Sequence, residues 1–228
     1  HIPVVYINGN HDAGPHFENY FMKAQRRAYR ASANGLNFAF EAGPAHITMV
    51  NSNSWGLSEM NADLSDLPVD KRALNEIKET ISWLQDELRS PSARQATWRI
   101  VGMHHPYTEQ FSNKRVTGIL EDNDVNLMLG GHLHAYQKSI SMIPERAART
   151  VFVTQGTAEG AHGEMNYGPA DERIFPDLPE VVAFCRTMFG KIDIVGEQLR
   201  YSVYGQPKGE KDIRLLDETV LTRETPHL

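Results

Sequence analysis

The sequence predicts an α/β protein with α+β character, and three observations predict this fold class. Short apolar runs rich in β-branched or large side chains, typical of buried strands, lie at residues 2–7, 99–101 and 125–129. A segment with an apolar residue at every third or fourth position, typical of an amphipathic helix, lies at residues 70–89. Residues 191–194 and 198–204 alternate with period two around a Val-Gly-Glu turn, which predicts a β-hairpin.

Each of the three apolar runs leads directly into a polar turn. The turns are Asn-Gly-Asn-His-Asp at 8–12, Gly-Met-His-His at 102–105 and Gly-Gly-His-Leu-His at 130–134. Open α/β sheets gather ligands at the carboxyl ends of their strands, so we expect these polar residues to meet in one cleft. The glycines at 9, 130 and 131 are expected to form tight turns that let the backbone approach an ion.

Two helices are expected between these strands. The first spans residues 17–30 and carries basic side chains that we interpret as a solvated face: Lys23, Arg26, Arg27 and Arg30. The second spans residues 70–89, with Asp70 as its N-cap and Pro91 closing it. Its apolar stripe is interpreted as core packing: Leu74, Ile77, Ile81, Leu84 and Leu88.

The final part of the chain is expected to hold one more strand, a loop and the hairpin. The strand covers residues 151–153, and a proline- and glycine-containing loop covers residues 164–179. This loop is either an insertion on the substrate side of the site or a linker. The single cysteine, Cys185, excludes an internal disulfide and a thiolate zinc cage, and we interpret it as a small buried apolar residue.

Composition narrows the class of protein. With 228 residues and 40% hydrophobic content, the chain is long enough to bury one sizeable core as a single domain. It has no apolar stretch of membrane-spanning length. A formal net charge of −6 argues against nucleic acid as a partner, since no basic face is available for a polyanionic duplex.

The His-x-His pair at 132 and 134 suits a metal centre. In an extended segment, side chains at i and i+2 lie on the same face, so His132 and His134 can present two imidazoles side by side. Two metals in a phosphate-ester hydrolase sit about 3.5–4 Å apart, a separation that such neighbours can span. Nitrogen and oxygen ligands without sulfur suit iron, zinc or manganese.

Several segments resemble the calcineurin-like metallophosphoesterase superfamily, and within it the purple-acid-phosphatase-like branch. They are the three polar turns together with residues 37–52, 83–88, 104–107 and 131–139. The resemblance runs from residue 1 to about residue 160 and continues more loosely into the hairpin. It implies a four-layer αββα sandwich in which the hairpin closes the second sheet.

The same resemblance implies roles for individual residues. Asn10, His104 and His132 would bind the second metal, and His134 would bind the first. His11 would be the catalytic histidine, with Asp12 as its hydrogen-bonding partner.

The family's earlier motifs supply the remaining first-metal ligands and a bridging aspartate, and no counterpart of them is identified in this sequence. Residues 1–228 are therefore expected to be the C-terminal, N-terminally truncated portion of a single metallophosphoesterase catalytic domain. The full-length parent would hold two metal ions, and this piece one or none.

Other histidines are assigned on weaker grounds. His105 follows a ligand directly, so in a strand it would point away from His104, which favours a role in the substrate pocket over ligation. His162 lies in a glycine-rich loop that the resemblance puts beside the active site, so it is a candidate for substrate binding. His16 and His46 have no ligand-like spacing and are expected to be structural or exposed.

The function implied is hydrolysis of a small-molecule phosphate ester by a metal-dependent phosphatase or phosphodiesterase. A metal-bridged hydroxide would attack phosphorus while His11 protonates the leaving oxygen. The alternative is a non-catalytic, truncated or degenerate scaffold that binds at most one metal. Neither a membrane nor nucleic acid is an expected partner. The family resemblance allows an extracytoplasmic location, and the sequence leaves the compartment, the substrate and the oligomeric state open.

Overall fold

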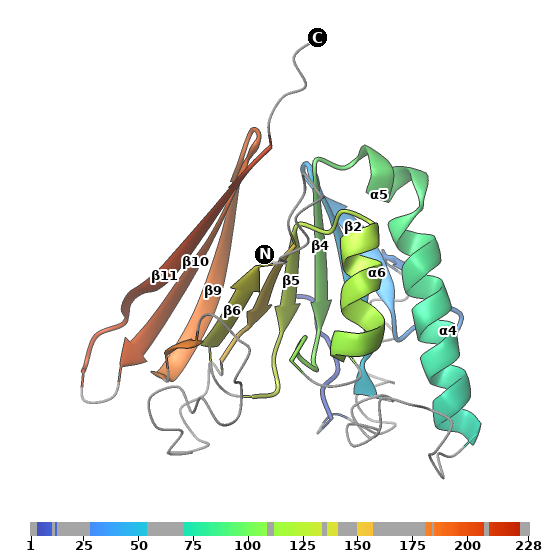
Figure 1. Cartoon of the computed structure of the whole chain (residues 1–228), viewed down its shortest axis with the longest axis horizontal. Coiled ribbons are helices and arrows are strands. Elements are labelled where there is room, and N and C mark those ends of the chain that lie inside the picture. Colours follow the sequence, from blue (N-terminus) through green and yellow to red (C-terminus); the bar gives the residue numbers. More distant parts are fainter. Residues whose placement is uncertain are drawn as a thin grey trace.

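The computed structural model of the chain contains a large and a small β-sheet with helices beside the large one. It describes residues 4–10, 12, 28–53, 71–108, 112–133, 136–140, 150–156, 181–183, 185–207 and 210–223. Helices α4 and α6 cover one face of the large sheet, and the small sheet lies on the other face (Figure 1). The described ranges thus form three of the four layers of the expected sandwich, and the mixed α/β class is confirmed.

The large sheet has eight strands in the order β1-β2-β3-β4-β5-β7-β6-β8. Their bounds are β1 Arg30–Ala31, β2 Phe38–Ala42, β3 Ala45–Val50, β4 Trp98–Met103, β5 Leu127–Gly130, β6 Tyr136–Ile140, β7 Val151–Thr154 and β8 Val181–Ala183. Strands β3, β4, β5 and β7 are parallel neighbours, so their carboxyl ends meet at one edge of the sheet. The expected strands at 99–101, 125–129 and 151–153 are confirmed, with shifts of a few residues at their ends.

The long helix is close to its expected position. Helix α4 spans Lys71–Leu88, and the short helix α5 (Pro91–Gln95) follows it. Pro91 therefore begins a helix rather than only closing one, with the Ser90 hydroxyl accepting a hydrogen bond from Ala93 N at 3.2 Å. A π-helical turn, Ser112–Val116, leads into α6 (Thr117–Asp122). Among the described residues, no helix is long and apolar enough to cross a membrane.

Alternation along the parallel strands divides the core in two. Val101, Met128 and Phe152 face the helices and pack with Leu84 and other buried residues of α4 and α6. Their neighbours in the strands face the small sheet, including Trp98, Ile100, Leu127, Val151 and Val153. Because both faces of these strands are buried, they appear in the sequence as continuous apolar runs.

The small sheet is the predicted hairpin with one further strand. Strands β9 (Cys185–Val195), β10 (Gln198–Pro207) and β11 (Arg214–Thr222) are antiparallel in the order β11-β10-β9. The β9–β10 turn contains Gly196 at φ 58°, a conformation that favours glycine. On β11, Asp217 accepts hydrogen bonds from Tyr136 Oη at 2.7 Å and Lys138 Nζ at 2.5 Å, which tie the small sheet to β6.

The strand expected at residues 2–7 is wrong for its described part. Residues 4–9 have no regular secondary structure, and Val4 and Tyr6 are 65% and 42% exposed. Strand β3 pairs directly with β4, so this segment does not enter the sheet between them. Ile7 lies against β4 instead, since a Cβ on Gly102 would be 2.9 Å from Ile7 Cδ1.

Some expectations fall outside the described residues. They concern most of the helix at 17–30, the loop at 164–179 and the side chain of Cys185. Arg30, the described end of that helix, instead forms β1 and makes salt bridges with Glu41 and Glu87. His46 is fully buried beside the same two carboxylates, as expected for a structural histidine.

A candidate metal centre at the strand ends

A tight turn presents the first candidate residue. Asp12 N donates to Gly9 O at 3.0 Å, and the Asp12 carboxylate accepts from Gly9 N at 2.8 Å, which closes the turn on itself. Asn53 Nδ2 also donates to Gly9 O, at 2.8 Å, and anchors the turn to the end of β3. The turn leaves Asn10 exposed and directed at the end of β4. Asp12 therefore has an observed structural role, whereas its expected partner His11 lies outside the described residues.

The segment after β5 is held in an unusual backbone conformation. His132 has φ 70°, a left-handed value that non-glycine residues rarely adopt, and Leu133 N donates to Gly131 O at 2.8 Å across it. Gly131 N donates to His104 O at 2.8 Å, so this segment is joined to the end of β4. Strain of this kind concentrates at functional sites, where the surrounding structure maintains it.

Gly9 and Gly131 begin tight turns, as expected, but the reason for glycine at 9 and 130 is space rather than backbone freedom. None of Gly9, Gly130 and Gly131 has a positive φ, so none is required by turn geometry. A Cβ on Gly9 would lie 2.9 Å from ring atoms of His104, and one on Gly130 would lie 2.9 Å from Pro106 Cα. Two of these glycines thus make room for neighbouring residues of the site.

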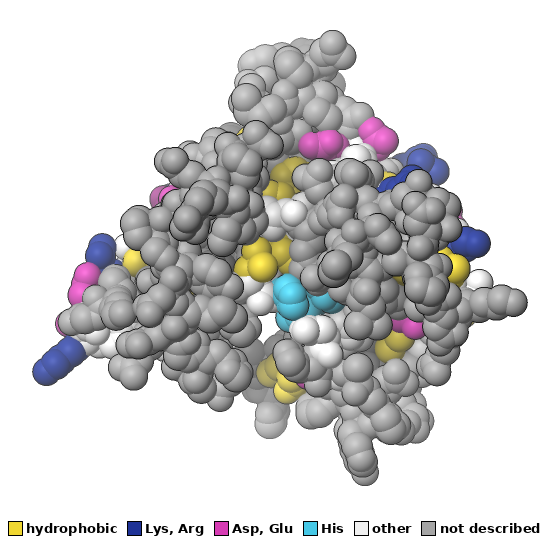
Figure 2. Space-filling view, turned by 60° about the horizontal axis from the view of Figure 1, so that its bottom comes forward, with side chains coloured by type: hydrophobic (Ala, Val, Ile, Leu, Met, Phe, Trp, Pro, Cys, Tyr) yellow, Lys and Arg dark blue, Asp and Glu magenta, His cyan; other side chains and the backbone are white. Residues whose placement is uncertain are grey.

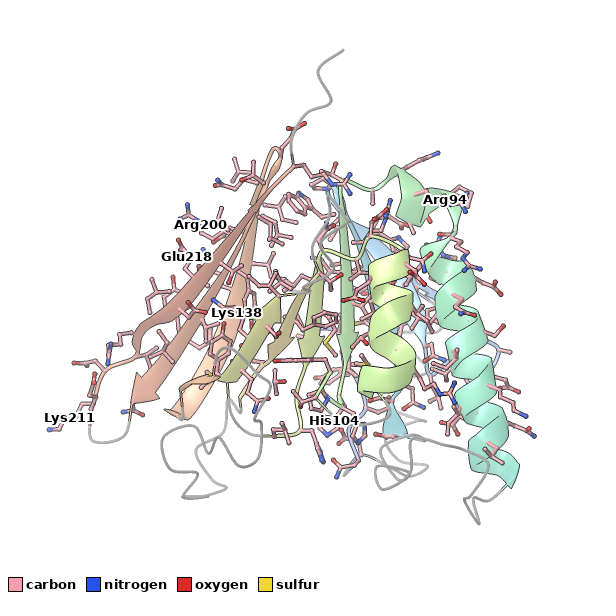
Figure 3. The ribbon with its side chains drawn as sticks, in the orientation of Figure 1. Arg94, His104, Lys138, Arg200, Lys211 and Glu218 are labelled. Carbon is pink, nitrogen blue, oxygen red and sulfur yellow. The ribbon has the colours of Figure 1, made fainter. Side chains whose placement is uncertain are left out.

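Three predicted metal ligands converge at this edge of the sheet. His104 Nε2 lies 2.9 Å from Asn10 Oδ1 and 3.2 Å from His132 Nδ1. His104 lies at the strand ends in Figure 3, and histidine side chains are visible together near the middle of the face in Figure 2. The convergence of Asn10, His104 and His132, expected from three separate motifs, is what the structure shows.

His105 joins this cluster, contrary to the expected orientation. Its ring lies 5.0 Å from that of His104 and 4.9 Å from that of His132, measured between centroids. The potential ligand atoms of the three histidines all lie within 4.8 Å of one another. The expectation assumed strand alternation, but β4 ends at Met103, so alternation does not extend to residues 104 and 105.

The environment of His105 keeps its ring neutral. The residue is 1% exposed, and Ser52 Oγ lies 2.8 Å from its Nδ1 and accepts from its backbone N at 3.0 Å. Burial, followed by the neighbouring His104 and His132, lowers the pKa of His105 to about 3. A neutral imidazole is the form that binds a metal.

The residues present fit a transition metal ion. Two ligand atoms held about 2.0–2.2 Å from one ion in tetrahedral or octahedral geometry lie roughly 3–3.5 Å apart. The distances from His104 Nε2 to Asn10 Oδ1 and His132 Nδ1, 2.9 Å and 3.2 Å, are of this size. Within the described part of the chain, the cluster that could hold an ion contains imidazoles and no carboxylate.

The remaining predicted site residues, His134 and His162, lie outside the described residues, as His11 does. Three residues that bear on the site were missed: Asn51, Ser52 and Asn53 follow β3 and contact the turn at Asn8 and Gly9 or the ring of His105. The signal was available, because they are polar residues at the end of an apolar strand.

Comparison with known proteins gives matches of sequence and of fold. The family model described as calcineurin-like phosphoesterase matches residues 1–136. A purple acid phosphatase, PPD1, isolated from yellow lupin (Lupinus luteus) seeds, has a similar fold, with a TM-score of 0.53 and 11% sequence identity over 86% of this chain and 34% of that chain. GAP50, the anchor in the inner membrane complex of Plasmodium, gives a TM-score of 0.47 and 15% identity over 82% of this chain and 54% of its own. The chain thus spans about a third of the lupin protein and about half of the Plasmodium protein.

Proposed function

The chain belongs to the calcineurin-like phosphoesterase family, and on that premise we propose that it is a metal-dependent phosphoesterase acting on small phosphate esters. One observation carries the proposal. Asn10, His104 and His132, from three separate segments, bring their ligand atoms to within hydrogen-bonding distance at the carboxyl edge of the sheet. The two sheets share one core, which supports a single catalytic domain.

In this proposal each residue has a distinct task. Asn10, His104 and His132 hold an iron, zinc or manganese ion, since the set offers nitrogen and oxygen without sulfur. The bound metal supplies Lewis acidity toward the phosphate oxygens. His105, buried and neutral beside them, is placed to contact the substrate or to complete the ligand set. The Gly9–Asp12 hydrogen bonds fix the direction of Asn10.

The finer steps are proposed from the sequence. His134 would bind the first metal, the partner of the one at Asn10, His104 and His132. His162 would contact the substrate, and His11, next to the ligand Asn10, would protonate the leaving oxygen. A proton donor is needed because an alkoxide is a poor leaving group.

A second candidate function, a non-catalytic scaffold that binds at most one metal, is favoured by the ligand set. The described cluster holds imidazoles and a carboxamide, which carry no negative charge, and the nearby Asp12 carboxylate is engaged by Gly9 N. Two divalent ions a few ångströms apart repel strongly unless carboxylates compensate their charge. A mononuclear site fits the described residues better than a binuclear one.

Hydrolysis of p-nitrophenyl phosphate and bis(p-nitrophenyl) phosphate, with manganese, zinc or iron(II), separates the two candidates. The enzyme proposal expects metal-dependent turnover that is lost in His132→Ala. If the chain binds metal but hydrolyses neither substrate with any of these metals, the scaffold is favoured and the enzyme proposal for this chain is overturned. The matched control is Glu79→Gln, an exposed position on α4, which should retain both properties.

A further inference from the structure

Asn51, the residue that follows β3, is a buried hydrogen-bonding hub next to the metal centre. It is 1% exposed, and its Oδ1 accepts from Asn8 Nδ2 at 2.8 Å and from Asn53 N at 3.2 Å. Its Nδ2 donates to Glu76 Oε1 on α4 at 2.7 Å, and its backbone N donates to Asn37 Oδ1 at 2.8 Å. Both the oxygen and the nitrogen of the Asn51 carboxamide are thus hydrogen-bonded, the oxygen toward the turn and the nitrogen toward α4.

On one side, the hub holds the turn that carries Asn10. Asn8 precedes that turn and is 6% exposed, and Asn53, bound to the same Asn51 oxygen, donates to Gly9 O at 2.8 Å. Gly9 lies directly against the imidazole of His104, since a Cβ there would fall 2.9 Å from the ring. A displacement of Asn51 would therefore reach both Asn10 and His104.

On the other side, the hub is attached to helix α4. Glu76 accepts from Asn51 Nδ2, and Thr80 Oγ1, one turn further along the same helix face, accepts from Asn37 Nδ2 at 3.2 Å. Asn37 in turn accepts from the backbone N of Asn51. Two positions of α4, one turn apart, thus hold Asn51. Glu76 binds its side chain directly, and Thr80 acts on its backbone through Asn37.

We propose that Asn51 is a positioning residue for the metal centre, which transmits the position of α4 to the Asn8–Gly9–Asn10 turn and so sets the separation of Asn10 and His104. This inference rests on the proposed metal-binding function of that site. Groups that orient metal ligands through hydrogen bonds commonly change metal affinity roughly 10–100-fold when they are altered. Because Asn51 reaches Asn10 only through Asn8 and Gly9, we expect a change of about tenfold, the lower end of that range.

The test exchanges the polarity of one hydrogen bond without changing its shape. Asn51→Asp retains the oxygen that accepts from Asn8 and Asn53 but sets a second oxygen against Glu76. Glu76→Gln alone retains its acceptor oxygen, so the bond from Asn51 survives. In the double variant, Gln at 76 donates to Asp at 51, which restores the bond with the same net charge as the original pair. Glu79→Gln, exposed on the same helix, is the control.

Two readouts are required. The first is the ring ¹⁵N chemical shifts of His104 and His132 in the metal-free protein, and the second is the affinity for manganese by titration calorimetry. Circular dichroism at the same temperature establishes that each variant is folded. We expect Asn51→Asp to shift the His104 signals and weaken manganese binding about tenfold, and the double variant to restore both. The extra negative charge of Asn51→Asp alone would strengthen cation binding, so weakening identifies a positioning effect.

The inference fails if the single variant leaves the ring signals and the affinity unchanged, or if the folded double variant does not restore them. If Asn51→Asp does not fold, Glu76→Ala decides by the same readouts, since it removes the acceptor alone. Absence of manganese binding in the unaltered protein would count against the proposed function. The metal-free ring signals would then decide whether Asn51 positions the histidines.

Discussion

Replacement of Gly9 by alanine tests the packing of the metal centre most simply. The backbone at Gly9 does not have a positive φ, so alanine brings no conformational strain there. The added Cβ would lie 2.9 Å from both Cε1 and Nδ1 of His104, whereas ordinary van der Waals contact begins at 3.4 Å. The imidazole must therefore retreat by roughly half an ångström, or the turn must move by the same amount.

That displacement is large on the scale of metal coordination. Ligand distances in a well-formed site hold within about 0.2 Å, so His104 and Asn10 can no longer serve one ion in the same geometry. We expect Gly9→Ala to weaken manganese binding roughly 10–100-fold, the range seen when metal ligands lose their orientation. The measurement is titration calorimetry on the folded variant, with thermal unfolding recorded in parallel.

Gly118→Ala is the matched control. It is the same chemical change in helix α6, where a Cβ would meet nothing within 4 Å. It should leave metal affinity unchanged and raise stability by about 0.5–1 kcal/mol through better helix propensity. If Gly9→Ala binds manganese as tightly as Gly118→Ala does, the contact between the turn and His104 does not control the site, and the reasoning is refuted.

Three further predictions concern ligation, acid stability and packing. His132→Ala should abolish binding of the metal at the described site, whereas His11→Ala should lower turnover and leave metal content nearly intact; equal metal loss by elemental analysis would contradict these roles. Burial raises the pKa of Asp217, but hydrogen bonds from Lys138 and Tyr136 outweigh it and hold that pKa below its usual 3.8. The stability gained is present above the unfolded-state pKa and is lost as pH falls through the folded-state pKa. Asp217→Asn should therefore lower the free energy of unfolding by about 1–3 kcal/mol at neutral pH, and that free energy should fall less steeply as the pH is lowered. Leu84→Ala, on the buried face of α4, should cost roughly 2–5 kcal/mol, measured by denaturant unfolding.

Local patterns predicted most of the described secondary structure. Helix α4 follows from the spacing of its apolar residues. Strands β4, β5 and β7 follow from continuous apolar runs, which are typical of strands covered on both faces. The β9–β10 hairpin follows from alternation around Gly196. In each case the pattern that predicts the helix or strand lies within the residues that form it.

The segment before the first turn shows where such inference fails. Residues 4–7 have the apolar composition of a strand, but a strand also needs a free neighbour, and β3 and β4 pair with each other. Strand pairing depends on the whole sheet, so the sequence of one segment does not show whether it has a partner. The orientation of His105 was wrong for a related reason, since it depended on where β4 ends.

Within the site, the sequence supplied the ligand candidates but not their supports. Asn10, His104 and His132 belong to histidine- and asparagine-containing motifs typical of metal sites. The local sign of Asn51 is only its position after an apolar strand, which does not identify its partners. Its importance comes from burial and from partners at positions 8 and 76, which only the folded chain brings together.

Anomalous X-ray diffraction from crystals grown with zinc, recorded on both sides of the zinc absorption edge, tests the central claim most directly. The account predicts one strong peak about 2.0–2.2 Å from His104 Nε2, a ring nitrogen of His132 and Asn10 Oδ1. A fully loaded crystal with no peak at these three side chains, or with zinc bound elsewhere, would contradict it.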